Sequence, residues 1–364
     1  MKKRLLAMIL GLTMVRSMVA CAGNNEETTK ASDAAAETTA EETTTEAPET
    51  TPEAAPTEPA TSEAVDAQPG HIRIGSLKGP TSMGLVQLMD KAQKGETTNT
   101  YEFTMAAAAD EINTALIKGD LDIVLIPANV ASVLYNKTGG EVVVLNINTL
   151  GVLYILESGE TIQSIADLAG RTIYLPGKGT TPDYALQYLL AQNGLTTEDV
   201  DLQYKSEGTE VIAALAQDKE AIGLLPQPAA TVATVQNEGL RIALDLTAEW
   251  DKVSEDGGLL TGVTLVRKAF LEENAGAVEL FLADHLASTN YTNENVADAA
   301  EMVAALGIVP KAPIAVKAIP YCNIVCITSA EMKEALSGYL GVLADQNATA
   351  IGGALPGEDF YYMP

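Results

Sequence analysis

From about residue 70 onward, the chain alternates between two hydrophobic patterns. Short apolar runs that favour strands are followed by segments with apolar residues three or four positions apart, which favour helices. Such alternation is typical of α/β proteins with parallel strands. The pattern predicts strands at 71–77, 101–106, 120–128 and 141–147, and helices at 82–95, 109–119 and 129–139.

The pattern recurs at a constant offset of 99 residues. Residues 111–131 align with 210–230, and the opening segment keeps the same offset, so that Thr81 aligns with Thr180. The identical pairs within the first alignment are Glu111/Glu210, Ala115/Ala214, Leu116/Leu215, Ile123/Ile222, Leu125/Leu224, Pro127/Pro226 and Ala131/Ala230. One offset held over a long segment indicates two related α/β lobes. The alternative is two generic units of similar composition.

Each lobe opens with a glycine-containing loop between a strand and a helix. The loops read SLKGPTSMG at 76–84 and LPGKGTTPD at 175–183. Ligands of open α/β sheets bind outside the carboxyl ends of the strands, where helix-start N–H groups and hydroxyls offer hydrogen bonds. Neither loop has the glycine–lysine spacing of a nucleotide phosphate loop. The two loops therefore predict a clamp for a small polar molecule, without nucleotide chemistry.

The candidate ligand-binding residues lie in these loops, at strand ends near them and near the expected crossovers. They are Gly79, Thr81, Ser82, Met83, Asn129, Asn148, Gly177, Lys178, Gly179, Thr180, Thr181, Gln227, Tyr321, Cys322 and Asn323. Structural alternatives stay open for several of them. Thr81, Ser82 and Asn129 also fit as helix caps, while Tyr321 and Cys322 also fit as packing residues.

The first 20 residues have the layout of a signal peptide. Three basic residues at 2–4 precede a short apolar stretch, and a small residue precedes Cys21. The sequence MVAC resembles a bacterial lipobox, although Met18 stands where that pattern prefers leucine and Arg16 sits late. We expect lipidation of Cys21 and anchoring to the outer face of the cell membrane. An ordinary signal peptide with an incidental cysteine is the alternative.

Residues 21–69 differ in composition from the rest of the chain. They consist almost entirely of Glu, Thr, Ala and Pro and contain no aromatic residue. Such a segment cannot bury enough apolar surface to fold, and it predicts a disordered acidic tether. The net charge of −27 divides into +4 up to Cys21, −11 in 22–68 and −20 in the remainder. An acidic folded part repels nucleic acid, which excludes a nucleic-acid partner.

The histidines and cysteines do not predict a metal or catalytic site. Cys322 and Cys326 lie in a run at 321–328 that favours a strand, where positions four apart are separated by about 13 Å, too far for a disulfide. His71 and His285 have no ligand spacing around them. We therefore expect no metal, no cofactor and no activated nucleophile.

Together these segments resemble a bacterial ABC-importer substrate-binding protein. The resemblance rests on the lipobox, the tether, IRIGSLKGPTSMGL, SIADLAGRTIYLPGKGTTPDYALQYLLAQNGL and the closing IGGALPGEDFYY, and covers 70–364. More narrowly, the chain is similar to the NMT1/THI5-like group, which includes sulfonate, nitrate, bicarbonate and thiamine-precursor binders. These motifs are common across type II periplasmic binding proteins, so they indicate fold and class but not substrate.

The resemblance implies two Rossmann-like α/β lobes with a ligand cleft between them, formed by 70–148, 149–262 and 263–364, the last returning to the first lobe. It implies a monomeric, non-enzymatic protein that captures a small polar or heterocyclic molecule and delivers it to an ABC permease. Two alternatives stay open. One is a surface lipoprotein that senses a ligand without transport. The other is an enzyme of cofactor biosynthesis on the same fold, against which the secretion signal argues.

The chain has few arginines and few aromatic residues, and their positions are the only indication of the ligand class. An oxyanion ligand favours bidentate arginine, yet no arginine lies in a candidate loop. Lys78 and Lys178 are the cations there, the latter also fitting as a solvated side chain. These counts favour a polar or heterocyclic molecule over an inorganic anion. The arginines after residue 70 are Arg73, Arg171, Arg241 and Arg267, and the tyrosines considered for stacking are Tyr154, Tyr174 and Tyr321.

Overall fold

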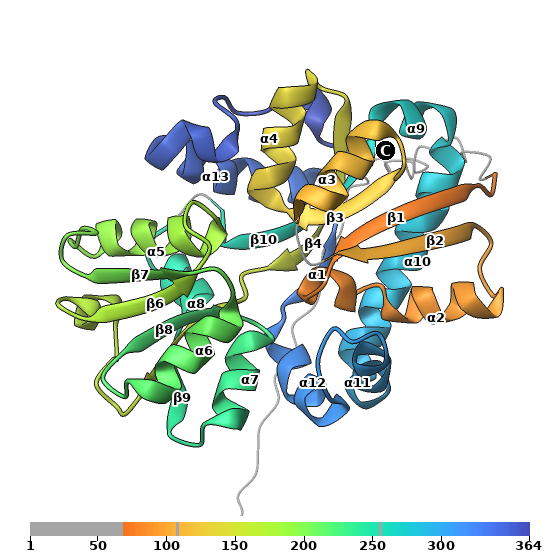
Figure 1. The fold of residues 1–364 in the computed structure, drawn as a ribbon. Coiled ribbons are helices and arrows are strands. Elements are labelled where there is room, and N and C mark those ends of the chain that lie inside the picture. The colour runs from red at the N-terminus through yellow and green to blue at the C-terminus, as the bar shows by residue number, and fades with distance from the viewer. Residues whose placement is uncertain (1–67, 107–108, 255–256) are drawn as a thin grey trace, which may run out of the picture. The chain divides into compact units, whose positions relative to one another are not determined.

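The structure is a computed structural model that describes residues 68–106, 109–254 and 257–364. The predicted signal peptide, Cys21 and nearly all of the predicted tether lie outside the described residues. Within them, no helix combines the length and apolar character needed to cross a membrane. The described chain is a mixed α/β structure with two separate sheets (Figure 1).

The first sheet has six strands and contains the first glycine loop. Strands β2, β1 and β3 are parallel, with β2 at one edge, and β10 pairs antiparallel with both β3 and β4. In spatial order the strands are β11 (Ile324–Ile327), β4 (Val142–Leu150), β10 (Leu260–Arg267), β3 (Ile123–Pro127), β1 (His71–Leu77) and β2 (Thr100–Ala106).

The second sheet has five strands and contains the second glycine loop. Strands β7, β6 and β8 are parallel, and β5 pairs antiparallel with both β8 and β9. In spatial order the strands are β7 (Asp201–Lys205), β6 (Thr172–Pro176), β8 (Ile222–Pro226), β5 (Leu153–Ser158) and β9 (Leu240–Asp245).

Helices flank both sheets (Figure 1). The α-helices are α1 (Pro80–Met83), α2 (Val86–Lys94), α3 (Ala109–Lys118), α4 (Ala128–Thr138), α5 (Thr181–Gln192), α6 (Gly208–Gln217), α7 (Ala229–Gln236), α8 (Leu246–Asp251), α9 (Lys268–Glu273), α10 (Ala275–Glu294), α11 (Val296–Ala305), α12 (Ala312–Ala318) and α13 (Ser329–Asn347). Short 3₁₀ turns are η1 (Ile165–Leu168), η2 (Ile319–Tyr321), η3 (Ala348–Ile351) and η4 (Glu358–Phe360).

The strand registers reproduce the internal repeat. Ile74 pairs with Ile123 across β1 and β3, and Ile173 pairs with Ile222 across β6 and β8. Both members of the second pair are 99 residues beyond those of the first. Because register decides which face each side chain occupies, this agreement extends to the cores of both lobes. The predicted α/β architecture with two related lobes is therefore confirmed.

Two predicted elements differ from the structure. The helix predicted at 82–95 is divided into α1 and α2 at Gly84. A side chain at Gly84 would lie 3.1 Å from Thr289 Oγ1 of α10, so the chain bends there against a helix distant in sequence. The strand predicted at 321–328 is limited to β11, because η2 extends to Tyr321 and Asn323 adopts a left-handed φ of 44°.

Asp122 joins three adjacent strands at the amino end of β3. Its side chain is 1% exposed and accepts hydrogen bonds from the guanidinium groups of Arg73 in β1, at 2.5 Å, and Arg267 in β10, at 2.7 Å. Burial alone would raise the pKa of the Asp122 carboxyl, but these hydrogen bonds outweigh burial and hold the pKa below its usual value. Asp122 therefore stabilises the sheet as an anion.

His285 of α10 is buried against the first sheet. Its ring stacks on Phe281 at 5.5 Å, and Nδ1 lies 3.1 Å from Nδ2 of Asn146. Asn146 also donates to Cys326 Sγ at 3.4 Å, and Nε2 of His285 has no partner among the described residues. Burial lowers the pKa of His285 from 6.5 to about 4. The folded protein thus holds this histidine neutral.

We expect stability to fall as the pH drops from about 6.5 towards 4. The unfolded chain takes up the His285 proton first, so the free energy of unfolding decreases by about 3 kcal/mol over that interval. Urea unfolding at successive pH values measures this slope. His285→Gln should flatten it, whereas His71→Gln, at the other and exposed histidine, should not. An equal slope in His285→Gln and the wild type would show that His285 is not responsible.

Candidate functional site

Two adjoining cavities open between the lobes, beyond the carboxyl ends of β3 and β8. Their volumes are about 310 and about 430 Å³. Both are lined by Pro127, Val152, Pro226 and Thr261. Pro127 and Pro226 are partners in the internal repeat and end equivalent strands, β3 and β8. The two cavities thus form one cleft, to which each lobe contributes equivalent segments.

The first glycine loop lines the larger cavity. Lys78, Gly79 and Thr81 lie on its wall, opposite Thr209 at the start of α6 and Gln227 after β8. Gln227 is 1% exposed, and its Oε1 accepts a hydrogen bond from Thr231 Oγ1 at 2.8 Å. This cavity therefore brings the loop after β1 of the first lobe together with the end of β8 in the second lobe.

The second glycine loop lines the smaller cavity. Gly179, Thr180 and Thr181 lie on its wall together with Asn129, which follows β3. Thr181 Oγ1 donates to Asn129 Oδ1 at 3.4 Å, a hydrogen bond that joins the two lobes. The arrangement mirrors the larger cavity, as the repeat predicts. Seven predicted residues from both lobes and both loops thereby line the two cavities that share Pro127.

The loop hydroxyls are partly engaged within their own loops. Thr81 Oγ1 and Ser82 Oγ donate to the carbonyl of Leu77 at 3.0 and 2.6 Å, and Thr180 Oγ1 donates to the carbonyl of Gly177 at 2.5 Å. Thr81 and Ser82 lie inside α1, and Asn129 lies inside α4, whose N-cap is Pro127. The alternative interpretation of these three side chains as helix caps is therefore wrong.

Four other predicted residues lie near the loops or strand ends but do not line the cavities. Gly177 has a φ of 69°, which favours glycine, and Lys178 places Nζ 5.2 Å from the centre of the Tyr204 ring. Asn148 is buried and donates to Thr264 Oγ1 at 3.1 Å. Met83 is fully buried in an apolar cluster with α11 and α12. None of these four residues lines either cavity.

The predicted residues 321–323 lie outside the two cavities. Tyr321 is 51% exposed and lines a different groove, and Cys322 is buried with Sγ donating to the carbonyl of Ala318. Asn323 donates to the carbonyl of Gly151 in the first crossover. Tyr154 is buried and donates to the carbonyl of Tyr321 at 3.0 Å. These side chains pack around the crossover between β4 and β5.

Comparisons with known proteins agree with this architecture. Residues 93–257 match a family model described as an ABC transporter, phosphonate, periplasmic substrate-binding protein. The chain has the two-lobe fold of periplasmic substrate-binding proteins. The resemblance predicted from the sequence is confirmed at that level. No curated protein matches the chain.

Three solved structures of this fold show how much of the chain it covers. An ABC transporter protein from Parabacteroides distasonis has a TM-score of 0.68 and 22% identity, covering 80% of this chain and 98% of that one. The aliphatic sulphonate binding protein SsuA from Escherichia coli has a TM-score of 0.64 and 19% identity, and the match covers 80% of this chain and 96% of that one. The alkanesulfonate-binding protein SsuA from Xanthomonas axonopodis pv. citri, bound to MOPS, has a TM-score of 0.58 and 18% identity, and the match covers 80% of this chain and 96% of that one.

Several cleft residues of the binding-protein fold were missed in the sequence. Val152 lies in the first crossover between the sheets, and Thr261 lies at the start of β10, directly after the second; both residues line both cavities. Thr209 lies at the start of α6, which the repeat makes equivalent to the start of α3. The crossovers were predicted, but their side chains were not considered. Extending the repeat to every helix start would have found Thr209.

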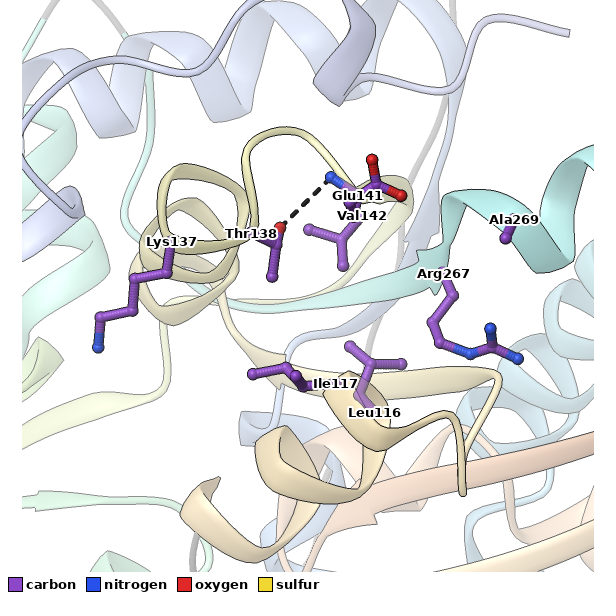
Figure 2. A pocket seen from close by; sticks show the side chains of 8 residues that line it. All are labelled: Leu116, Ile117, Lys137, Thr138, Glu141, Val142, Arg267 and Ala269. Atoms are coloured by element: carbon purple, nitrogen blue, oxygen red, sulfur yellow. Dashed lines mark hydrogen bonds between the residues drawn. The ribbon is translucent and has the colours of Figure 1, made fainter.

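A separate hollow lies on the first lobe, away from the cleft (Figure 2). Leu116 and Ile117 at the end of α3 form one side, and Thr138 accepts a hydrogen bond from the Glu141 backbone N–H on another. Arg267, on its rim, is engaged by Asp122. None of the predicted site residues lines this hollow, so the interlobe cleft is the candidate site.

Proposed function

We propose that this protein is an extracytoplasmic solute-binding protein that captures a small molecule between its lobes and delivers it to an ABC permease. The observation that carries the proposal is the convergence of both glycine loops on one cleft at equivalent strand ends. A ligand that contacts both lobes stabilises the closed form by its differential contacts there. A permease that recognises the closed form would then receive the ligand.

We further propose that Cys21 is lipidated and that residues 21–69 tether the binding domain to the outer face of the membrane. The sequence layout described above supports this proposal. Mass spectrometry of the mature N-terminus should detect an acylated Cys21, and Cys21→Ser should release the protein from the membrane. An unmodified N-terminus beginning elsewhere would contradict the proposal.

The proposed function involves no covalent step. The Cys322 thiol is buried, which raises its pKa, and burial raises the pKa of Cys326 to about 11. Neither thiol is therefore a thiolate at neutral pH, the state in which cysteine acts as a nucleophile. Neither of these two cysteines is therefore a candidate nucleophile.

Native mass spectrometry of the protein purified from its own host tests the proposal. We expect a small-molecule adduct that is lost on denaturation, with an exact mass that identifies the ligand. Returning that ligand at 100 times its Kd should stabilise the fold by about 2.7 kcal/mol. If no adduct is found, and a small-molecule extract of the host does not raise the melting temperature, the proposed function is wrong.

A further inference from the structure

All four arginines of the described residues are engaged outside the cleft. Arg73 and Arg267 bind Asp122, and Arg241 binds Glu157. Arg171 donates to Thr161 Oγ1 and to the carbonyl of Glu220, at 2.9 and 3.0 Å. Lys78 is the one cationic side chain among the residues that line the two cavities, and it is exposed. The described part of the chain therefore gives the cleft no fixed bidentate cation of the kind that suits an oxyanion.

Four helices around the cleft have a proline at the N-cap or in the first turn, so their starts offer fewer backbone N–H groups to an anion. Pro80 and Pro182 lie in the first turns of α1 and α5, and the N-caps of α4 and α7 are Pro127 and Pro228. Proline has no N–H group. All four prolines line the cavities. They replace N–H donors with apolar ring atoms at the positions where helix starts bind anions.

A carboxylate already occupies the anion position of the second loop. The backbone N–H of Gly179 donates to Asp183 Oδ2 at 2.7 Å, and Asp183 is 2% exposed. Tyr204 and Gln187 donate to its other oxygen at 2.8 and 2.7 Å. An anionic ligand at this loop would have to approach this buried negative charge, which is energetically unfavourable.

The cavity walls do not favour a cation either. Among the residues that the structure describes, no Asp, Glu or aromatic residue lines either of the two cavities, so a cation would meet neither a carboxylate nor a ring face of these residues. The tyrosines considered for stacking are elsewhere, since Tyr154 is buried and Tyr174 lies under Lys205. Apart from the residues already named, the walls are mostly aliphatic, including Leu153, Ile212, Val232 and Ile308.

Two buried polar atoms belong to residues of these walls, and their side chains have to turn towards the cavities before a ligand can reach them. Nε2 of Gln227 and Oγ1 of Thr261 are buried and have no partner among the described residues. Gln227 uses Oε1 for Thr231, which leaves its amide N–H groups as donors. Thr261 lines both cavities, and its hydroxyl both donates and accepts. Unpartnered buried polar groups are costly, and a ligand atom that pairs with them removes that cost.

We infer that the cleft binds an uncharged organic molecule with a mainly apolar surface, whose hydrogen-bonding atoms pair with Gln227 and Thr261. This inference rests on the proposed binding function and names its ligand class. Gln227 selects an acceptor such as a carbonyl oxygen or a ring nitrogen. Thr261, where the cavities meet, fixes a second polar atom. The proline walls contact the apolar remainder.

A charge-resolved binding experiment tests the inference. The full-length protein is purified from its host and dialysed extensively to remove bound small molecules. It is then melted with a small-molecule extract of the same host that has been separated on anion and cation exchangers. We expect the fraction that neither exchanger retains to raise the melting temperature. An increase only with a retained fraction would overturn the inference and leave the proposed function intact. No increase with any fraction would overturn both.

Three variants test the roles of Thr261 and Gln227, with binding measured in the extract fraction that raises the melting temperature of the wild type. Thr261→Val removes the hydroxyl at nearly constant shape, and we expect it to weaken binding about tenfold. Thr261→Ser keeps a hydroxyl and should bind within a few-fold of the wild type. Gln227→Glu keeps the acceptor for Thr231 but removes the donor, and should weaken binding at least tenfold. Wild-type binding by Thr261→Val and Gln227→Glu, with melting temperatures unchanged in the absence of ligand, would overturn the assignment.

Discussion

Tryptophan at both Thr180 and Thr209 should abolish ligand binding and leave the fold intact. Both threonines are exposed and lie at the starts of α5 and α6, where each lines a different cavity. An indole at each position would occupy much of cavities of about 310 and about 430 Å³. The loss of the Thr180 hydrogen bond to Gly177 costs about 1 kcal/mol, which a domain of this size tolerates.

The double variant is compared with the wild type by native mass spectrometry and by ligand-dependent melting. We expect affinity to fall at least 100-fold, or about 3 kcal/mol, so that the adduct is lost. Thr197→Trp is the matched control, because Thr197 is exposed on the same lobe and lines neither cavity. Normal binding by the double variant would show that the ligand site lies elsewhere.

The single variants separate the two halves of the cleft. Thr180→Trp fills the smaller, more apolar cavity, and Thr209→Trp fills the one that contains Lys78 and Gln227. A ligand confined to one cavity loses affinity in only one variant. A ligand that bridges the lobes through Thr261 loses affinity in both.

The parts of the fold that depend on local pattern were predictable from the sequence. The 99-residue offset gave two lobes, and the registers Ile74–Ile123 and Ile173–Ile222 preserve it. Strand pairing depends on which face each apolar residue occupies, so a repeated pattern leads to a repeated register. For the same reason the repeat predicted that the loops after β1 and β6 occupy equivalent positions at the carboxyl ends of the strands in the two sheets. Both now lie on one cleft.

The features that were not predictable depend on segments distant in sequence. Met83 lies two residues after Thr81, which lines the cleft, yet its side chain is buried against α11 and α12, and its carbonyl accepts from Thr292 Oγ1, 209 residues later. The break at Gly84 has the same origin, because α10 packs against it. Thr261 carries no motif at all. It becomes notable only because the start of β10 lies near Pro127 and Pro226, with which Thr261 lines both cavities.

The largest loss of stability is expected from Asp122→Asn. The amide keeps the shape of the side chain but removes the charge that Arg73 and Arg267 share. Backbone hydrogen bonds from Asp122 N to the Arg73 carbonyl and from Arg267 N to the Asp122 carbonyl surround the same point. Breaking a buried ion pair costs about 3–5 kcal/mol. Because the arginines are 33% and 25% exposed, water compensates part of this loss, and we expect about 2–3 kcal/mol.

Thermal unfolding measures the loss as a decrease of roughly 5–10 °C in Tm. Asp90→Asn is the control, because it removes an exposed pair with Lys94 at 2.7 Å and should cost below about 1 kcal/mol. The Asp122 carboxyl has a lowered pKa in the folded state, so its stabilising effect is present above pH 3.8 and is lost below it. The difference between wild type and Asp122→Asn should therefore shrink in strong acid. A difference that is small at neutral pH, or that persists unchanged below pH 3, would show that the charge of Asp122 does not hold these strands together.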